Sequence, residues 1–227
     1  MLRTPLLPVL AIILCGLTIA PVVVGQEENA ADERPTLAQL AATSDLVGIA
    51  QVYYTDYTYR HGYAVDGTAY LRMLITYRAD QEVEQFRVKE KGLRDNECYF
   101  PTTEYGSDGA RFLVFLSRRE DGDYIGHPRL CMLPIAVTAE QAYAMPYPRP
   151  EVNLTATGEA AVTAMTFSDA LAMVDVSDLT RSMAARRADE LGGELRDDRI
   201  VYTQGIPIGV VRKLLGEDNL KLPRLNR

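Results

Sequence analysis

Residues 45–60 read DLVGIAQVYYTDYTYR, and this stretch decides the fold class. Apolar or aromatic residues alternate along it with small or polar ones, which is the period of two that a β-strand requires. One alternating set is Leu46, Gly48, Ala50, Val52 and Tyr54. Because its small members leave room for a neighbouring backbone, we expect close packing along this strand, as at the bend of a barrel.

Four further segments also have the residue pattern of β-strands, and no segment with a helical period lies between them. They are residues 68–78, 84–92, 110–120 and 128–137. The run FLVFL in the third of these is apolar on both faces, which predicts a central strand. Asp66-Gly67 predicts the reversal between the first two strands. Five consecutive strands joined by turn residues predict an antiparallel barrel, closed or half-closed.

Helical patterns flank the predicted strands. A short helix is expected over residues 37–43, before the first strand. After the last strand, a second helical pattern begins at Ser177 as N-cap and ends at Gly192-Gly193, and residues 206–217 predict a final helix. The fold class that follows is α+β: mainly β, with a helical C-terminal extension.

The domain boundaries follow from these changes in pattern. Residues 36–137 are the predicted barrel domain, and residues 138–227 are a proline-rich strap followed by the helical extension. The strap itself is the stretch 142–152, AYAMPYPRPEV, whose prolines favour an extended backbone.

The N-terminus predicts export. Residues 1–25 have the features of a signal peptide, with one basic residue, an apolar core interrupted at Pro21, and small residues that predict cleavage before Gln26. Residues 26–35 are a charged, flexible leader. We therefore expect a secreted or periplasmic protein without an integral membrane span after cleavage. An uncleaved anchor and a lipoprotein modified at Cys15 are the alternatives, although the residue before Cys15 is a large leucine.

The charge of the mature chain limits its partners. Loss of Arg3 leaves 24 − 1 = 23 basic residues against 31 acidic ones, a net charge of −8. Nucleic acids and anionic membrane surfaces attract basic patches, and the sequence holds no run of Lys and Arg with interleaved aromatics. This composition argues against nucleic acid as a partner and favours a protein or a component of the cell envelope.

The mature chain keeps two cysteines, Cys98 and Cys131. A zinc site needs about four ligands in close pairs, and a redox pair is typically CxxC. Neither pattern is present. In an oxidising compartment we expect Cys98 and Cys131 to form a disulfide.

The order of these features resembles secreted bacterial proteins with an OB-like barrel, which share their general architecture with tissue-inhibitor-of-metalloproteinase and netrin-like modules. The matching motifs are Ser44-Asp45-Leu46-Val47, Val88 with Lys91-Gly92, and Arg111 with Leu113-Val114-Phe115-Leu116. The sequence departs from the pattern at Ile49, where glycine is usual. The resemblance implies an OB-like five-stranded barrel over about residues 36–137. It implies no zinc-protease inhibition, because the N-terminal cysteine that chelates the zinc in those inhibitors is missing at Gln26.

The richest cluster of one residue type is YYTDYTYRHGY, residues 53–63. Tyr53, Tyr57 and Tyr59 fall on one alternating face, and Arg60 and His61 follow them. Tyrosine combines a large contact area with a polar tip, which suits a binding surface. These five residues are the candidate partner-binding site, and cross-strand aromatic pairing on the barrel exterior is the structural alternative.

Catalytic and metal chemistry has little support in the sequence. His61 and His127 lie in turn-like contexts, and exposed loop histidines are the expected outcome for both. The Asp-Gly pairs are turn signals and do not have the ligand spacing of a calcium loop. We predict no cofactor, no metal and no catalytic residue.

Three functions remain open. The sequence favours a non-catalytic binding or interaction module. The alternatives are an envelope hydrolase that uses His61 or His127, and a structural or assembly protein that acts through its C-terminal helices.

Overall fold

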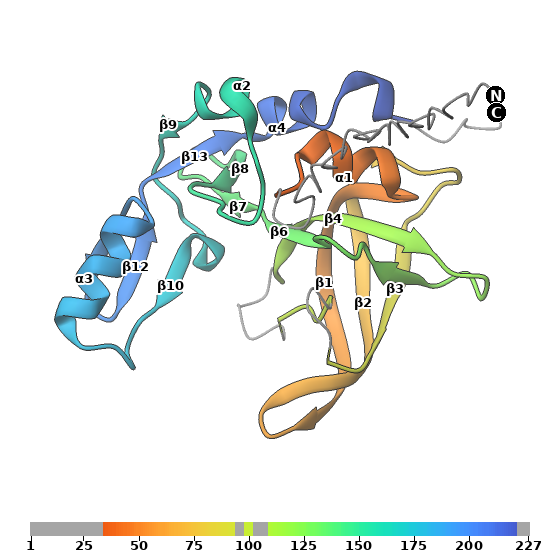
Figure 1. Ribbon diagram of the computed structural model, residues 1–227, viewed down its shortest axis with the longest axis horizontal. Coiled ribbons are helices and arrows are strands. Elements are labelled where there is room, and N and C mark those ends of the chain that lie inside the picture. The colour runs from red at the N-terminus through yellow and green to blue at the C-terminus, as the bar shows by residue number, and fades with distance from the viewer. Residues whose placement is uncertain (1–33, 94–97, 102–108, 222–227) are drawn as a thin grey trace, which may run out of the picture. The chain divides into compact units, whose positions relative to one another are not determined.

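The structure is a computed structural model that describes residues 34–93, 98–101 and 109–221. Helix α1 (Leu37–Thr43) precedes the strands of the first half of the chain. These strands are β1 (Leu46–Arg60), β2 (Tyr63–Arg78), β3 (Gln85–Lys91), β4 (Arg111–Arg118), β5 (Tyr124–Gly126) and β6 (Met132–Pro134). They are hydrogen-bonded in the order β1-β2-β3-β5-β4, and β1 also pairs with β4, so five strands close into a barrel (Figure 1). The predicted barrel is confirmed.

One pairing of the barrel differs from the antiparallel expectation. β3 and β5 run parallel and meet at a single register pair, Val88 with Tyr124, whereas the other neighbours are antiparallel. β6 pairs with β4 outside the ring. The ring is therefore mixed, and its weakest seam lies between β3 and β5.

Strand β4 has apolar residues on both faces because it borders two cores. Phe112, Val114 and Leu116 point into the barrel, where they pack in a cluster that also includes the disulfide cysteines. Leu113 and Phe115 point outward and pack with α1 and with residues of the C-terminal half. The central strand that FLVFL predicts is confirmed by this double burial.

The reversal between β1 and β2 lies at His61-Gly62. Arg60 pairs with Tyr63, and the two residues between them have φ values of 51° and 85°, as in a two-residue hairpin turn. The prediction of a reversal at Asp66-Gly67 is wrong. Gly67 lies within β2, where a Cβ would come within 2.1 Å of the Asp56 carbonyl oxygen, so glycine is needed there for close approach of the two strands.

The C-terminal half contains the expected helices and also strands that the sequence did not predict. Its strands are β7 (Ala136–Val137), β8 (Tyr143–Pro146), β9 (Thr163–Ala164), β10 (Met173–Asp175), β11 (Gly193–Arg196), β12 (Arg199–Tyr202) and β13 (Gln204–Pro207). They form two small sheets, ordered β7-β8-β13-β9 and β10-β12-β11. Its helices are α2 (Thr155–Glu159), α3 (Arg181–Glu190) and α4 (Ile208–Leu214), with short 3-10 turns η1 (Ala170–Ala172) and η2 (Glu217–Asn219). Strands this short carry too little alternation to be read from sequence.

Helix α3 begins later than its sequence pattern indicates. Its N-cap is Thr180, whose side chain accepts a hydrogen bond from the Met183 N–H. Ser177 belongs to the preceding turn, where its N–H donates to the Asp175 carboxylate. Both residues are good caps by type, and the turn at Asp175 decides which of them starts the helix.

The two halves of the chain share one hydrophobic core. Val47 and Ile49 of β1 pack in a cluster that includes Met145 of β8, Ile206 of β13 and Val211 of α4. A further cluster joins α3 to β12. From Arg34 onward, the described chain is one compact unit.

Cys98 and Cys131 are joined by a disulfide, with Cα atoms 5.8 Å apart, as the sequence predicts. Gly126 fits closely against it, since a Cβ there would lie 2.5 Å from the Cys98 Cβ. Within the described residues, no helix combines the length and the apolar character needed to cross a membrane.

Candidate binding surface

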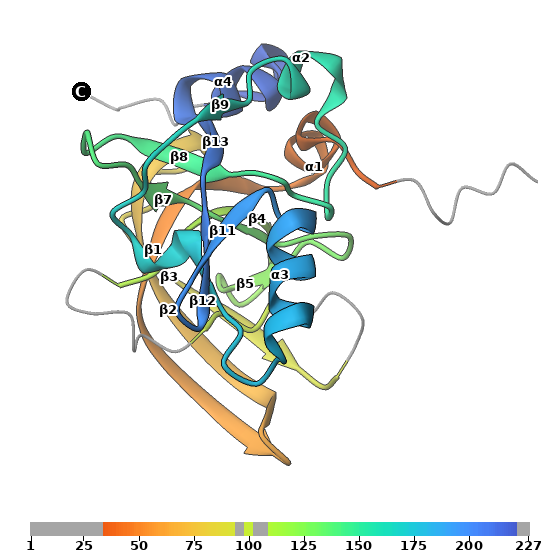
Figure 2. The same cartoon turned by 90° about the vertical axis from the view of Figure 1, so that its left-hand side faces the viewer.

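The outer halves of β1 and β2 and the turn between them, residues 53–70, form a hairpin ribbon that we call the tyrosine arm, and β3 pairs with its β2 strand over residues 66–70. β4 pairs with β1 only from Leu46 to Gln51, so among the described strands the arm part of β1 pairs with β2 alone. Figures 1 and 2 show this ribbon extending past β4.

Four tyrosines of the arm are exposed: Tyr53, Tyr54, Tyr59 and Tyr63, with 49–69% of each residue accessible to solvent. A register shift between Val52 and Tyr54 interrupts the alternation of β1, so adjacent Tyr53 and Tyr54 are both exposed. Both rings pack beside Tyr70 of β2, with centroid distances of 6.3 and 5.5 Å. The arm therefore presents a larger aromatic surface than the three predicted tyrosines would give.

Tyr57 has a different position from the exposed tyrosines. Its ring packs edge-on against Tyr99 at 5.2 Å, and its hydroxyl accepts a hydrogen bond of 3.0 Å from the Phe100 N–H. Burial raises the pKa of Tyr57, and the bond from Phe100 opposes this in part. Tyr57 thus connects the arm to the segment next to the disulfide, which is a supporting role.

Arg60 and His61 lie at the tip of the arm, and both are exposed. His61 occupies the first position of the turn with a positive φ, a conformation that histidine adopts more readily than most residues. The structure therefore places all five predicted contact residues on the arm, and only Tyr57 turns inward. Their role in binding stays a prediction.

His127 is buried, with 6% of the residue accessible, so its predicted exposure is wrong. Its Nε2 lies 2.9 Å from the Thr43 hydroxyl, and its Nδ1 accepts a hydrogen bond from the Arg129 N–H. The Thr43 hydroxyl donates to the Gln39 carbonyl, so the proton of the Thr43–His127 pair belongs to Nε2. Burial, and to a smaller degree the charge of Arg129, lowers the pKa of His127.

The hydrogen bond between His127 and Thr43 runs in the opposite direction from the one that would activate a nucleophile. A general base must accept the proton of the attacking hydroxyl, whereas His127 donates to Thr43, and a backbone N–H occupies the ring nitrogen where an orienting acid would bind. His61 lies on the tyrosine arm and lacks a hydrogen-bond partner within the described residues. Among the described residues, neither histidine is therefore paired with a nucleophile that it could deprotonate.

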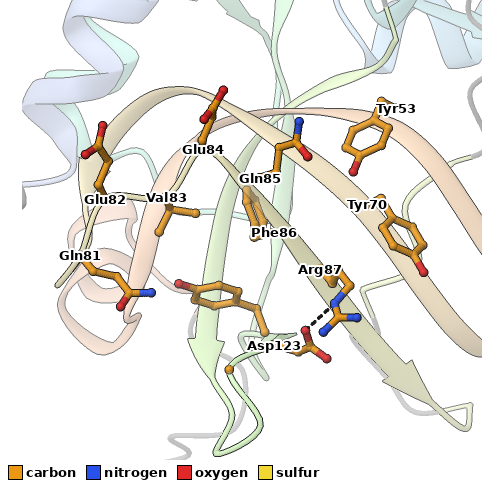
Figure 3. Close-up of a pocket in the computed structure, with 12 residues that line it drawn as sticks. Tyr53, Tyr70, Gln81, Glu82, Val83, Glu84, Gln85, Phe86, Arg87 and Asp123 are labelled. Carbon is orange, nitrogen blue, oxygen red and sulfur yellow. Dashed lines mark hydrogen bonds and ion pairs between the residues drawn. The ribbon is translucent and has the colours of Figure 1, made fainter.

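A hollow of about 680 Å³ adjoins the base of the arm, and we call it the acidic hollow. Figure 3 shows its lining, with Tyr53 and Tyr70 at one side and Glu82 and Glu84 along the segment that leads into β3. The side chains of its lining that are charged at neutral pH are three carboxylates and one guanidinium, so 1 − 3 gives a net charge of −2.

The charges of the acidic hollow are unevenly paired. Asp123 binds Arg87, with Nε and Oδ1 2.7 Å apart, and it also binds Lys89. Glu82 and Glu84 have no ion pair or side-chain hydrogen bond within the described residues. The hollow therefore offers two available carboxylates together with the exposed ring of Tyr53 and the partly exposed ring of Tyr70, a combination that suits a cationic group.

The sequence did not predict this hollow, because its residues come from β1, β2, the β2–β3 connection, β3, the turn before β5 and the start of β5. Only the register of β2 against β3, which pairs Tyr70 with Arg87, brings them together.

The C-terminal helices offer little apolar surface. The buried residues of α3 are Ala184 and Ala188, and Met183 is its one large exposed apolar side chain. In α4 the buried residue is Val211. The assembly alternative thus has a mostly charged surface to act through.

The chain matches no family model, and neither a curated protein nor a solved structure shows significant similarity to it. In the described part of the chain, no three His, Cys, Asp or Glu side chains come together in a way that could hold a metal ion.

Proposed function

We propose that the protein is a secreted or periplasmic, non-catalytic binding module that engages a protein partner through the tyrosine arm and the acidic hollow. The observation that carries this proposal is the group of exposed tyrosines on the arm, Tyr53, Tyr54, Tyr59 and Tyr63. Clusters of exposed aromatic side chains are unusual on a surface that meets only water, and tyrosine is enriched in protein interfaces.

The charge of the surface supports a basic partner. The acidic hollow has a net charge of −2, and the whole chain has a net charge of −7. Complementary charge steers association and excludes acidic competitors. Lys or Arg side chains of a partner would meet Glu82 and Glu84 at the hollow while apolar groups cover Tyr53 and Tyr54.

The proposed location rests on two features. The apolar N-terminal stretch has the features of a signal peptide, and a disulfide between Cys98 and Cys131 persists in oxidising compartments. The resemblance to secreted OB-like barrel proteins of the metalloproteinase-inhibitor and netrin-like architecture supports the same location.

The test is partner capture with matched variants. The purified protein, with a photo-crosslinking residue at Arg60, is exposed to an envelope extract and compared with the triple variant Tyr53→Ser, Tyr54→Ser, Tyr59→Ser. We expect a crosslinked protein that the triple variant loses and that Met183→Ser on α3 retains. Equal crosslinking by the triple variant would overturn the arm as the contact surface, and loss with Met183→Ser alone would favour the helical alternative.

A further inference from the structure

A second hollow, of about 520 Å³, lies where β1, β2 and β4 meet the C-terminal half, and we call it the basic hollow. Its polar wall is a row of cross-strand neighbours: Arg72 of β2 pairs with Gln51 of β1, which pairs with Arg111 of β4. The opposite wall includes Tyr143, Ser168 and Asp169. The walls of the basic hollow therefore come from both halves of the chain.

Arg111 is a buried cation whose hydrogen bonds are incomplete. Its residue is 8% exposed, and its Nη2 donates to Asp169 Oδ2 at 3.0 Å. Its Nη1 donates to the Gly109 carbonyl at 3.3 Å. Its Nε is buried and has no hydrogen-bond partner among the described residues. Buried donors without an acceptor are rare in proteins, and an acceptor from outside the protein is one explanation for such a group.

Asp169 cannot supply the missing acceptor without losing other bonds. Its Oδ2 accepts from both Arg111 and the Val137 N–H, and its Oδ1 accepts from the Leu171 N–H. These bonds fix the carboxylate at the Nη2 end of the guanidinium. The Nε of Arg111 is therefore left without an acceptor from Asp169.

Arg72 provides a second guanidinium on the same wall. It is exposed, and its Nη2 donates to Gln51 Oε1 at 2.7 Å, which orients it without neutralising it. Two arginines and one aspartate give the lining a charge of 2 − 1 = +1, in a chain whose net charge is −7. A positive hollow on an acidic protein attracts anions.

We propose that the basic hollow binds the carboxylate group of a small organic acid. A carboxylate has one negative charge and matches the +1 lining, whereas a phosphate group at neutral pH has a charge of about −1.5 to −2 and would exceed it. Guanidinium groups bind planar carboxylates through two parallel hydrogen bonds. Leu74 and the ring of Tyr143 line the same hollow and can contact the rest of the molecule.

The Ser168 hydroxyl adds a preference for ligands with a donor group. Its proton is directed at the carbonyls of Val137 and Thr138, each 3.3 Å away, so its oxygen remains as an acceptor. An amide or hydroxyl near the carboxylate would satisfy it, and N-acetylglycine has this combination.

The test is a titration followed by NMR of the arginine side-chain Nε–H signals in the full-length protein. N-acetylglycine is compared with N-acetylglycinamide, which has the same shape without the charge, and with acetate and inorganic phosphate. We expect N-acetylglycine to shift the Arg72 and Arg111 signals in a saturable way. Arg72→Gln should weaken binding about tenfold, and Arg196→Gln on β11, whose side chain is 63% exposed and lines neither hollow, should leave it unchanged.

Three results would overturn the proposal. They are equal shifts with the acid and the amide, binding to Arg72→Gln as tight as to the unaltered protein, and tighter binding of phosphate than of N-acetylglycine. Because Arg72 is exposed and lies outside both hydrophobic cores, its replacement is not expected to unfold the protein, and thermal denaturation of Arg72→Gln checks this.

Discussion

The two hollows differ in how they hold charge. In the acidic hollow, Asp123 is paired with Arg87 and Lys89, whose side chains are 51% and 39% exposed. In the basic hollow, the Arg111 side chain is 10% exposed and depends on Asp169 of the C-terminal half. An ion pair whose cations face water can be rehydrated when it breaks, whereas an enclosed pair cannot. The contact with the C-terminal half therefore encloses the cation of one ion pair, whereas in the other pair the carboxylate is 4% exposed and its two cations face water.

Opening the disulfide should produce the largest loss of stability, and it should affect the two hollows unequally. Cys98–Cys131 closes a loop of 33 residues, for which the chain-entropy model gives about 3–4 kcal/mol. Phe100 and Tyr99, which hold Tyr57 of the arm, are next to Cys98. We expect the Cys98→Ser, Cys131→Ser double variant to lose about this much free energy of unfolding in urea.

Hydrogen exchange would show whether this loss is local to the arm. Relative to the unaltered protein, the double variant should show a larger increase in amide exchange in the arm than around Asp169. The hydrogen bonds of Asp169 go to Arg111, Val137 and Leu171, which are not next to the disulfide. A uniform increase across both regions would contradict the link from the disulfide to the tyrosine arm.

Matched removal of one carboxylate from each hollow tests the comparison directly. Asp169→Asn leaves the buried Arg111 without its counter-charge, and we expect a loss of about 3 kcal/mol in the free energy of unfolding. Asp123→Asn leaves two cations that water can reach, and a loss of about 1 kcal/mol is expected. Urea denaturation of the two variants side by side measures the difference. Equal losses would show that the protein's stability depends no more on the ion pair enclosed by the C-terminal half than on the one whose cations face water.

The sequence predicted the barrel well because its signals are long and local. β1, β2 and β4 each show alternation or double burial over at least 8 residues, and the cysteines had no other plausible chemistry. The parallel contact between β3 and β5 was not predictable, since it involves a strand of 3 residues and one register pair.

The candidate site was predicted in part. The tyrosines stood out by composition, but the register shift at Val52/Tyr54 and the inward position of Tyr57 depend on pairing with β2 and on Phe100. The two hollows depend on residues far apart in the chain, such as Arg111 and Asp169, which are 58 positions apart. No local pattern marks such a pair, and only the fold brings it together.

A smaller effect should separate the supporting tyrosine of the arm from the exposed ones. Tyr57→Phe removes the acceptor of the Phe100 N–H, and we expect a loss of about 1 kcal/mol with faster exchange of that amide. Tyr59→Phe removes a hydroxyl from a half-exposed ring and should change stability by less than about 0.5 kcal/mol. The partner-capture assay should show the reverse order if Tyr59 contacts the partner and Tyr57 only supports the arm.

The smallest expected effect is a pH dependence that belongs to neither hollow. Burial lowers the pKa of His127, so the unfolded chain takes up a proton at a higher pH than the folded protein does. Stability from this residue is complete above the unfolded value of about 6.5, and it declines as the pH falls below that value towards the lowered folded pKa. Protonation would also break the hydrogen bond from the Arg129 N–H to Nδ1. When the pH is lowered from 7.5 to 5, the urea midpoint of the unaltered protein should decrease. It should decrease less in His127→Gln, because glutamine does not titrate.

Because His127 lines neither hollow, binding of N-acetylglycine by the folded protein should not follow this titration. Binding that follows the His127 titration would show that the basic hollow is coupled to the contact between α1 and the segment after β5.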